Sequence, residues 1–262
     1  MVSLKTGETR ADGAHHPPHA PARPPATVEV VPLSSSDPPR ERRRVLRPAC
    51  RMTVAAVVGV VAFLVIGNVA ILGASAWAKI SHPAPAAGGV EIPGVDNLNP
   101  VDDKVWRGSA PSRRGYATLA DEGFTTVIDL RAEDDVDVDG EALADLGLTL
   151  VKIPLRDGQA PGDGAVERFL AAAEASPGKV FVHCGAGVGR AGTMAAAWLV
   201  GNGEADGSGA LMRNLAVGPP SLEQVLFVQA LNGGSTERPG PVLTGVSRLL
   251  DGPRRLWSRY GL

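Results

Sequence analysis

The segment over residues 183–193 limits the possible folds of this chain more than any other feature. It reads His-Cys-Gly-Ala-Gly-Val-Gly-Arg-Ala-Gly-Thr, so Cys184 and Arg190 are separated by five residues, three of which are glycine. An apolar run precedes the segment at 180–182, and an apolar pattern suited to a helix follows it at 194–200. This order predicts a buried strand, a tight loop and a helix. Because glycine permits close approaches and left-handed backbone conformations, the loop N–H groups can turn inward and bind a tetrahedral anion.

Cys184 and Arg190 give this predicted loop the residue types of a phosphate-transfer site. The N-terminus of the following helix attracts negative charge, and a guanidinium can donate two parallel hydrogen bonds to phosphate oxygens. The same groups favour the thiolate of Cys184, which is the nucleophilic form of a cysteine. They also stabilise the charge that develops on the phosphoryl oxygens during transfer. We therefore expect Cys184 to attack phosphorus while Arg190 and the loop hold the phosphoryl group.

The Cys-x5-Arg segment resembles the signature loop of the cysteine-dependent protein tyrosine and dual-specificity phosphatases. Two further stretches, 105–111 and 126–131, look like the opening of compact bacterial-type members of that family, and 220–224 resembles their closing helix. The resemblance implies a phosphatase that works through a cysteinyl-phosphate intermediate, and we expect no cofactor. The site residues that it implies are the catalytic Cys184 and Arg190, the phosphate-binding Gly185, Ala186, Gly187, Val188, Gly189 and Arg190, and the supporting His183.

Asp157 is the candidate general acid, because the oxygen that leaves phosphorus needs a proton. It follows a strand-like run at 148–153 and lies in a stretch rich in glycine and proline, which predicts a loop. It lies 27 residues before Cys184, a spacing similar to that of the acid in dual-specificity phosphatases. One alternative is a turn aspartate that caps its own loop. The other is that Asp163 is the acid, although we assign Asp163 as the N-cap of a helix over 164–175.

Ala191 departs from the family pattern, which has serine or threonine directly after the arginine. In the family, that hydroxyl donates to the cysteine sulfur and helps it leave when the phosphoenzyme is hydrolysed. Losing a hydrogen bond to a charged group costs about 1.5–3 kcal/mol. We therefore expect slower breakdown of the phosphoenzyme, and we do not expect Thr193, two positions further on, to replace the missing hydroxyl.

An uncharged apolar run over 52–78 predicts a membrane-spanning helix, since about 20 such residues cross a bilayer. Basic residues concentrate on its N-terminal side, and Lys79 is the one basic residue directly after it. This asymmetry predicts a single-pass protein of the cell membrane, with its N-terminus in the cytoplasm and its catalytic domain outside. The alternative is secretion after signal cleavage, because residues 76–78 read Ala-Trp-Ala, a small-x-small cleavage pattern.

Composition divides the rest of the chain. We expect a disordered Pro/Arg-rich tail over 1–51, the membrane anchor or signal segment over 52–78, a Pro/Gly-rich linker over 79–100, the phosphatase domain over 101–233, and a C-terminal tail with a basic amphipathic segment over 234–262. That C-terminal tail either lies on a membrane surface or packs on its own domain as a helix. Pro253 limits the continuity of such a helix.

Short apolar runs alternate with amphipathic patterns through the phosphatase region. We expect strands near 104–107, 125–130, 148–153 and 180–183, and helices near 113–122, 140–146, 164–175, 190–202, 207–215 and 221–232. This alternation predicts an α/β fold with a mostly parallel central sheet flanked by helices, as the resemblance also implies. The Cys184 loop then lies at the C-terminal end of a central strand, where such folds bind ligands.

The charge balance and the cysteine and histidine spacing exclude several function classes. Residues 79–262 contain 17 Lys and Arg against 23 Asp and Glu, and an acidic domain excludes nucleic acid as a partner. No His-x-Glu or Cys-x-x-Cys spacing indicates a metal site, so we expect none. Cys50 and Cys184 are expected on opposite sides of the membrane, without a disulfide.

These observations predict a membrane-anchored protein phosphatase. Its expected substrates are phosphorylated proteins, with phosphotyrosine first and phosphoserine and phosphothreonine as further esters. One alternative is a non-catalytic module that binds phosphate without turnover, which the missing hydroxyl at Ala191 favours. Another is a phosphoinositide phosphatase, although relatives of that kind often carry lysine where Gly185, Ala186 and Val188 stand.

Overall fold

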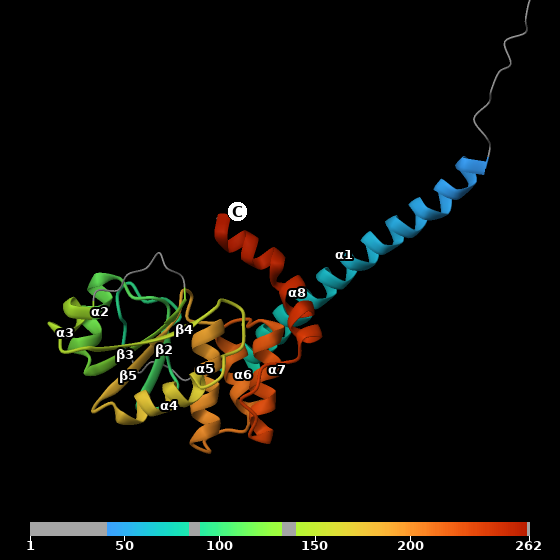
Figure 1. Ribbon diagram of the computed structural model, residues 1–262. Helices are drawn as coiled ribbons and strands as arrows, with labels where there is room; N and C mark the ends of the chain where they lie inside the picture. The colour runs from blue at the N-terminus through green and yellow to red at the C-terminus, as the bar shows by residue number, and fades with distance from the viewer. Residues whose placement is uncertain (1–40, 84–89, 133–139, 261–262) are drawn as a thin grey trace, which may run out of the picture. The chain divides into compact units, whose positions relative to one another are not determined.

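A five-stranded mixed sheet forms the centre of the protein, as a computed structural model of the chain shows (Figure 1). The structure describes residues 41–83, 90–132 and 140–260. The strands are β1 (Asn99–Pro100), β2 (Val105–Gly108), β3 (Phe124–Arg131), β4 (Thr149–Leu155) and β5 (Lys179–His183), in the spatial order β1-β2-β5-β3-β4. The last four run parallel to one another, and β1 pairs antiparallel with β2. The sequence predicted these four parallel strands within one or two residues, but not the two-residue β1, which is too short to show a pattern.

Helices cover both faces of this sheet (Figure 1). On one face lie α2 (Arg113–Asp121) and α3 (Gly140–Ala144), and on the other lie α4 (Ala165–Ala175) and α5 (Gly189–Gly201), with α6 (Gly207–Val217), α7 (Leu222–Ala230) and the short 3-10 helix η1 (Leu231–Gly233) packed around α5. Each face has its own apolar core, one including Leu119, Leu143 and Phe181, the other including Phe169, Met194 and Phe227. The expected layered α/β architecture is therefore confirmed.

β5 lies at the middle of the sheet, and its position explains why it reads as an unbroken apolar run. Phe181 packs into the core on the α2 side, whereas Val180 and Val182 pack into the core on the α5 side. A strand covered by helices on both faces has no polar side, so alternation of polar and apolar residues is lost. Cys184 follows directly, at the edge of the sheet where the parallel strands end.

The apolar run forms part of a long helix, α1 (Glu41–Ser81), which begins before the expected start at residue 52. Its portion Cys50–Ser81 is long and apolar enough to cross a membrane, a test that a signal sequence also passes. Near its C-terminal end, Ser75 is buried and donates its hydroxyl to the carbonyl of Leu215 at 2.7 Å. The expected disordered tail lies outside the described residues up to residue 40.

A final helix, α8 (Pro241–Tyr260), runs through Pro253 without a break. We expect from the sequence that Pro253 limits the helix, but the helix continues past it. The proline only removes one backbone N–H donor. α8 packs against α7, where the N–H of Glu223 donates to the hydroxyl of Ser247, and against α1, where the side-chain amide of Asn68 donates to the carbonyl of Leu250. The part of α8 up to Asp251 therefore packs on its own chain, and the side chains of the basic residues after Pro253 lie outside the described residues.

Candidate active site

The loop between β5 and α5 places Cys184 beneath the N-terminus of α5. Cys184 is buried, with 3% of its surface exposed, and α5 begins at Gly189. Gly187 has a φ of +75°, and a Cβ there would collide with the backbone of Gly108. A residue with a side chain cannot take this place without strain, so the glycine is required by both its conformation and its packing.

Two hydrogen bonds from a neighbouring segment hold this loop from outside. The backbone N–H of Ala110 donates to the carbonyl of Gly185 at 3.1 Å, and the side-chain amide of Asn97 donates to the carbonyl of Ala186 at 2.9 Å. Within the described part of the chain, the N–H groups of 185–188 donate no hydrogen bond. These amides therefore remain free to donate to an anion, which fits the expected phosphate-binding role of the loop.

Asn97, whose side chain supports the loop, was not predictable from the sequence. It has a φ of +51°, in the left-handed region that asparagine tolerates better than most residues. It lies 89 positions before its partner Ala186, and no local pattern connects the two. Only the folded chain brings Asn97 to the loop.

Arg190 and Asp157 meet at this loop. Arg190 lies in the first turn of α5, is 4% exposed, and donates from Nη1 to the carbonyl of Leu155 at 3.0 Å. Its Nε lies 3.4 Å from Oδ1 of Asp157, whose side chain is 57% exposed. The structure therefore brings Arg190 into contact with Asp157 at the loop that follows Cys184, with the carboxyl of Asp157 on the solvent side of the guanidinium. Such a carboxyl can exchange a proton with a group bound on the loop.

The loop that carries Asp157 is held by the first turn of α7. Ser221 donates its hydroxyl to the carbonyl of Gly158 at 2.8 Å, and the Gln224 amide donates to the carbonyl of Gln159 at 3.3 Å. The carboxylate of Glu223 accepts from the N–H of Ala160 at 2.9 Å.

The same turn of α7 is fixed by its own sequence. Ser221 and Gln224 form a capping box, in which each side chain bonds the other's backbone N–H. The sequence Ser-Leu-Glu-Gln at 221–224 therefore begins α7 and also supports the loop that carries Asp157. In the sequence, 220–224 resembles the closing helix of the family, which does not show that it supports the Asp157 loop. The capping-box pattern is visible in the sequence, but the sequence does not show that this turn contacts the loop at 158–160.

Asp163, the second candidate for the acid, does not have the role assigned to it. The helix α4 begins at Ala165, its N-cap is Gly164 in a left-handed conformation, and no side chain caps it. The expectation that Asp163 caps this helix is therefore wrong. Glycine is a favoured N-cap in its own right, since it leaves the first N–H groups open to solvent.

His183 is enclosed beneath the loop. Its Nδ1 lies 3.4 Å from the carbonyl of Cys184, and its Nε2 lies 3.5 Å from the hydroxyl of Tyr116. Burial lowers the pKa of His183 to about 4, although nearby Asp129 opposes this shift. The imidazole is therefore neutral at neutral pH, so it can support the loop through packing and hydrogen bonds but not through a positive charge.

Asp129 and Arg131 form a structural pair at the end of β3. Nε and Nη2 of Arg131 donate to the two carboxylate oxygens of Asp129 at 2.9 and 2.8 Å. Burial would raise the pKa of Asp129, but the hydrogen bonds from Arg131 outweigh it and hold the pKa below its usual value. The expectation of a brace beside the site agrees with this geometry.

The position after Arg190 offers no hydroxyl. Ala191 is fully buried, and Thr193 donates its hydroxyl to the carbonyl of Gly189 at 2.9 Å. Thr193 therefore stabilises the first turn of α5 and is already engaged there. Within the described residues, no group of three or more His, Cys, Asp or Glu side chains is arranged to hold a metal ion.

Comparisons with known proteins show the family of this chain. Residues 93–233 match the family described as "DSP-PTPase phosphatase fused to NAD+ Kinase". The chain is 34% identical over 99 residues to NAD kinase 2, chloroplastic, of Arabidopsis thaliana, and 30% identical over 113 residues to the probable NAD kinase 2, chloroplastic, of Oryza sativa. These matches cover 36% and 41% of this chain but only 10% and 12% of the plant proteins, so the chain spans about a tenth of their length.

Similar folds occur among solved structures. The active form of Tk-PTP is 23% identical, with a TM-score of 0.48 and coverage of 55% of this chain and 99% of that one. TpbA of P. aeruginosa is 20% identical, with a TM-score of 0.44 and coverage of 60% and 97%.

Proposed function

Because the chain belongs to the family of DSP-type phosphatases described as fused to NAD+ kinase, we propose that it hydrolyses phosphate monoesters on proteins through a cysteinyl-phosphate intermediate. Phosphotyrosine is the first expected substrate, with phosphoserine and phosphothreonine as further esters. The observation that carries this proposal is the contact of Asp157 with Arg190 at the end of the loop that begins at Cys184, whose N–H groups at 185–188 are free within the described residues.

The proposed reaction has two steps. In the first, the Cys184 thiolate attacks phosphorus in line, the ester bond breaks, and Asp157 gives its proton to the leaving oxygen. In the second, Asp157 takes a proton from water, whose oxygen attacks the phosphorus, and the sulfur leaves as the thiolate. Arg190 and the N–H groups of 185–189 hold the three non-bridging oxygens in both steps.

The surroundings of Asp157 support a permissive substrate range. Its side chain is more than half exposed, so a phosphorylated side chain can approach from solvent without a deep channel. The loop residues Gly185, Ala186 and Val188 present no positive charge of their own, which favours a simple monoester over a multiply charged phosphoinositide.

A second candidate function is binding of phosphorylated partners without turnover. Ala191 favours it, because a thiolate that receives no hydrogen bond from this position is a poorer leaving group. The intact set of nucleophile, arginine and acid favours the enzyme. We therefore propose the enzyme, and a measurement of turnover distinguishes it from the binding module.

We also propose that α1 anchors the protein in the cell membrane as a single uncleaved span. Its apolar residues from Met52 to Leu72 are mostly exposed in the folded chain, as a lipid-facing surface requires. The excess of basic residues before this segment supports a cytoplasmic N-terminus and an external catalytic domain.

The experiment that tests the activity is hydrolysis of p-nitrophenyl phosphate by the full chain in detergent, in reducing buffer with a chelator. The matched control is the Cys184→Ser variant, which keeps the loop and removes the nucleophile. We expect activity in the parent protein and none in the variant. A folded parent protein that binds vanadate but releases no product would support the binding module instead.

A further inference from the structure

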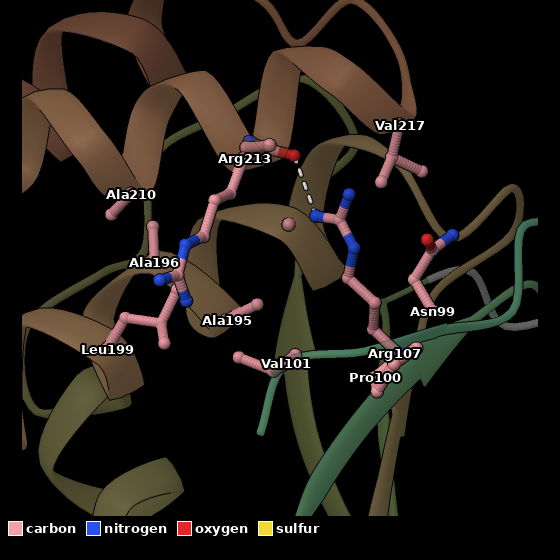
Figure 2. Close-up of a pocket in the computed structure, with 12 residues that line it drawn as sticks. Asn99, Pro100, Val101, Arg107, Ala195, Ala196, Leu199, Ala210, Arg213 and Val217 are labelled. Carbon is pink, nitrogen blue, oxygen red and sulfur yellow. Dashed lines mark hydrogen bonds between the residues drawn. The ribbon is translucent and has the colours of Figure 1, made fainter. Parts of the chain in front are cut away.

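Arg107 is a buried cation that has no carboxylate partner among the described residues. It lies on β2 with 3% of its surface exposed, and its Nη1 donates to Oδ1 of Asn214 at 2.7 Å. Its Nη2 has no acceptor within the described ranges. Figure 2 shows the guanidinium turned toward α6, where the dashed line marks its bond to Asn214. A neutral amide does not balance a buried charge, and an unbalanced buried charge is costly.

The register of the sheet places Arg107 near Cys184. Arg107 pairs with Val182 on the parallel neighbour β5. Side chains two residues apart on a strand point to the same face, and Val182 and Cys184 both belong to the core on the α5 side. Arg107 therefore lies on the same face as Cys184, diagonally across two adjacent strands.

The first turn of α5 is shaped to admit this guanidinium. A Cβ at Gly192 would overlap Nη1 of Arg107 and Oδ1 of Asn214. The helix can therefore pass directly over the Arg107–Asn214 bond only because Gly192 has no side chain. The positive charge of Arg107 therefore lies beside the N-terminal turn of α5, the helix that follows the Cys184 loop.

The other charged groups around the loop already have partners or carry no charge. Arg131 is paired with Asp129, and Arg190 lies against Asp157. His183 is neutral, because burial lowers its pKa to about 4.

Arg213, which lines the same hollow as Arg107, points away from it in Figure 2, toward Ala196 and Leu199. Burial lowers the pKa of Arg107 to about 10, and the charge of Cys184 opposes that shift. Arg107 is therefore charged at neutral pH, and the sulfur of Cys184, when ionised, is the negative charge that acts on it.

We propose that Arg107 is a positioning residue that provides a buried counter-charge for the Cys184 thiolate. This role rests on the proposed function, in which the thiolate is both nucleophile and leaving group. In this chain the charge of Arg107 supplies part of the stabilisation that a hydroxyl at Ala191 would have given. Arg107 does not touch the substrate and acts only through the sulfur.

The test measures how the reactivity of Cys184 depends on pH in the full chain in detergent. Cys50 is exposed and is replaced by Cys50→Ser, so that Cys184 is the one thiol left. Iodoacetamide measures the amount of thiolate, because the thiolate sulfur of Cys184 displaces iodide from the reagent. The key variant is Asn214→Asp, which keeps the hydrogen bond to Arg107 and adds a competing negative charge of nearly identical shape. Arg107→Met removes the charge, and Arg213→Gln is the control for net charge.

We expect Asn214→Asp and Arg107→Met to raise the midpoint of the alkylation profile by about one pH unit, which lowers the rate below the midpoint about tenfold. Arg213→Gln should leave the midpoint where it is. An unchanged midpoint in folded Asn214→Asp would overturn the role of Arg107, even if Arg107→Met failed to fold.

The same measurement separates this role from the proposed function. A parent protein whose Cys184 reacts like an ordinary cysteine would overturn both the role of Arg107 and the nucleophile. A reactive parent protein with an unresponsive Asn214→Asp variant would overturn the role of Arg107 alone.

Discussion

At the scale of single residues, the contact between Asp157 and Arg190 links the proposed acid to the residue proposed to hold the phosphate. The 3.4 Å distance from Nε to Oδ1 fixes where the carboxyl lies relative to a bound phosphoryl group. The sequence suggested both residues as candidates, because the loop composition and the spacing to Cys184 are visible in it. It did not show that they touch.

The Asp157→Asn substitution removes the proton but keeps the shape of the side chain. We expect kcat/KM to fall about 10²–10⁴-fold for alkyl and aryl phosphates with poor leaving groups. Esters with good leaving groups need little protonation, so their loss should be much smaller. A series of aryl phosphates of rising phenol pKa measures this difference. An equal loss for all esters would assign the acid to another residue.

The Ala191→Ser substitution restores the hydroxyl that the family places after the arginine. We expect it to speed breakdown of the phosphoenzyme by about tenfold or more, since a hydrogen bond to a charged sulfur contributes about 1.5–3 kcal/mol. Rapid-mixing measurements of the product burst against the steady-state rate separate this step from the first. If the ratio of burst to steady state stays the same, Ala191 does not limit turnover.

The buried neutral His183 makes stability depend on pH. Its pKa is about 4 in the folded protein and near 6.5 when exposed, so the unfolded chain binds more protons between these values. Stability should therefore be fully present above pH 6.5 and decline as the pH falls toward 4, by on the order of 3 kcal/mol.

Thermal unfolding of the full chain across this pH range, followed by tryptophan fluorescence, measures the effect of His183. Asp129, whose pKa is held down, adds a loss in the same direction at low pH. The His183→Gln variant should show a flatter profile than the parent protein. An identical slope in both would rule out His183 as the source.

At the scale of elements, α7 holds the loop that carries Asp157, the proposed acid. Three side chains of its first turn bond three consecutive backbone groups, those of Gly158, Gln159 and Ala160. A loop held in this way is already in place before substrate arrives, which lowers the entropic cost of placing the acid.

The Glu223→Ala substitution removes one of these bonds and leaves the N–H of Ala160 unpaired in a buried position. We expect a loss of about 1–3 kcal/mol in stability and a fall in kcat that is larger for poor leaving groups. Glu223→Gln keeps the accepting oxygen and should restore most of the activity. The same aryl phosphate series is the measurement. A loss that is equal for all leaving groups would mean that Glu223 supports the fold without placing the acid.

Most elements were predictable because their patterns are local. The strands β2 to β5 and the helices α2 to α7 each bury one side or two, and that burial is visible as periodicity. The cap of α4 was not predictable in the same way, because Asp163 and Gly164 are both acceptable N-caps and the choice depends on the path of the preceding loop. The continuity of α8 through Pro253 depends on its packing against α7, which no local pattern contains.

At the scale of the whole molecule, the predicted site depends on pairs that are distant in sequence. Cys184, Arg190 and the glycines form one continuous motif, and this is why they were recognised. Arg107 and Asn214 are 107 positions apart, and Asn97 and Ala186 are 89 apart. A single sequence contains no information on which distant residues meet, so these supports appeared only in the folded chain.

The proposed membrane arrangement predicts a specific pattern of protease access. With an epitope at the C-terminus, protease added to intact cells that express the full chain should remove the epitope. An epitope at the N-terminus should survive until the cells are permeabilised. Protection of the C-terminal epitope would reverse the orientation, and release of the C-terminal part into the medium without protease would indicate cleavage of the apolar segment.

The contact between α7 and α8 sets a boundary for the smallest active fragment. The N–H of Glu223 donates to the hydroxyl of Ser247, which is fully buried and lies beyond residue 233, where the family match ends. A fragment cut at that boundary would contain every residue proposed to bind or transfer phosphate. It would lose the Ser247 hydroxyl, which accepts a hydrogen bond from the N–H of Glu223. Glu223 in turn holds the loop of Asp157 through Ala160, so the proposed acid would be placed less firmly. Truncations intended for assay or crystallisation therefore need to extend at least through the first half of α8.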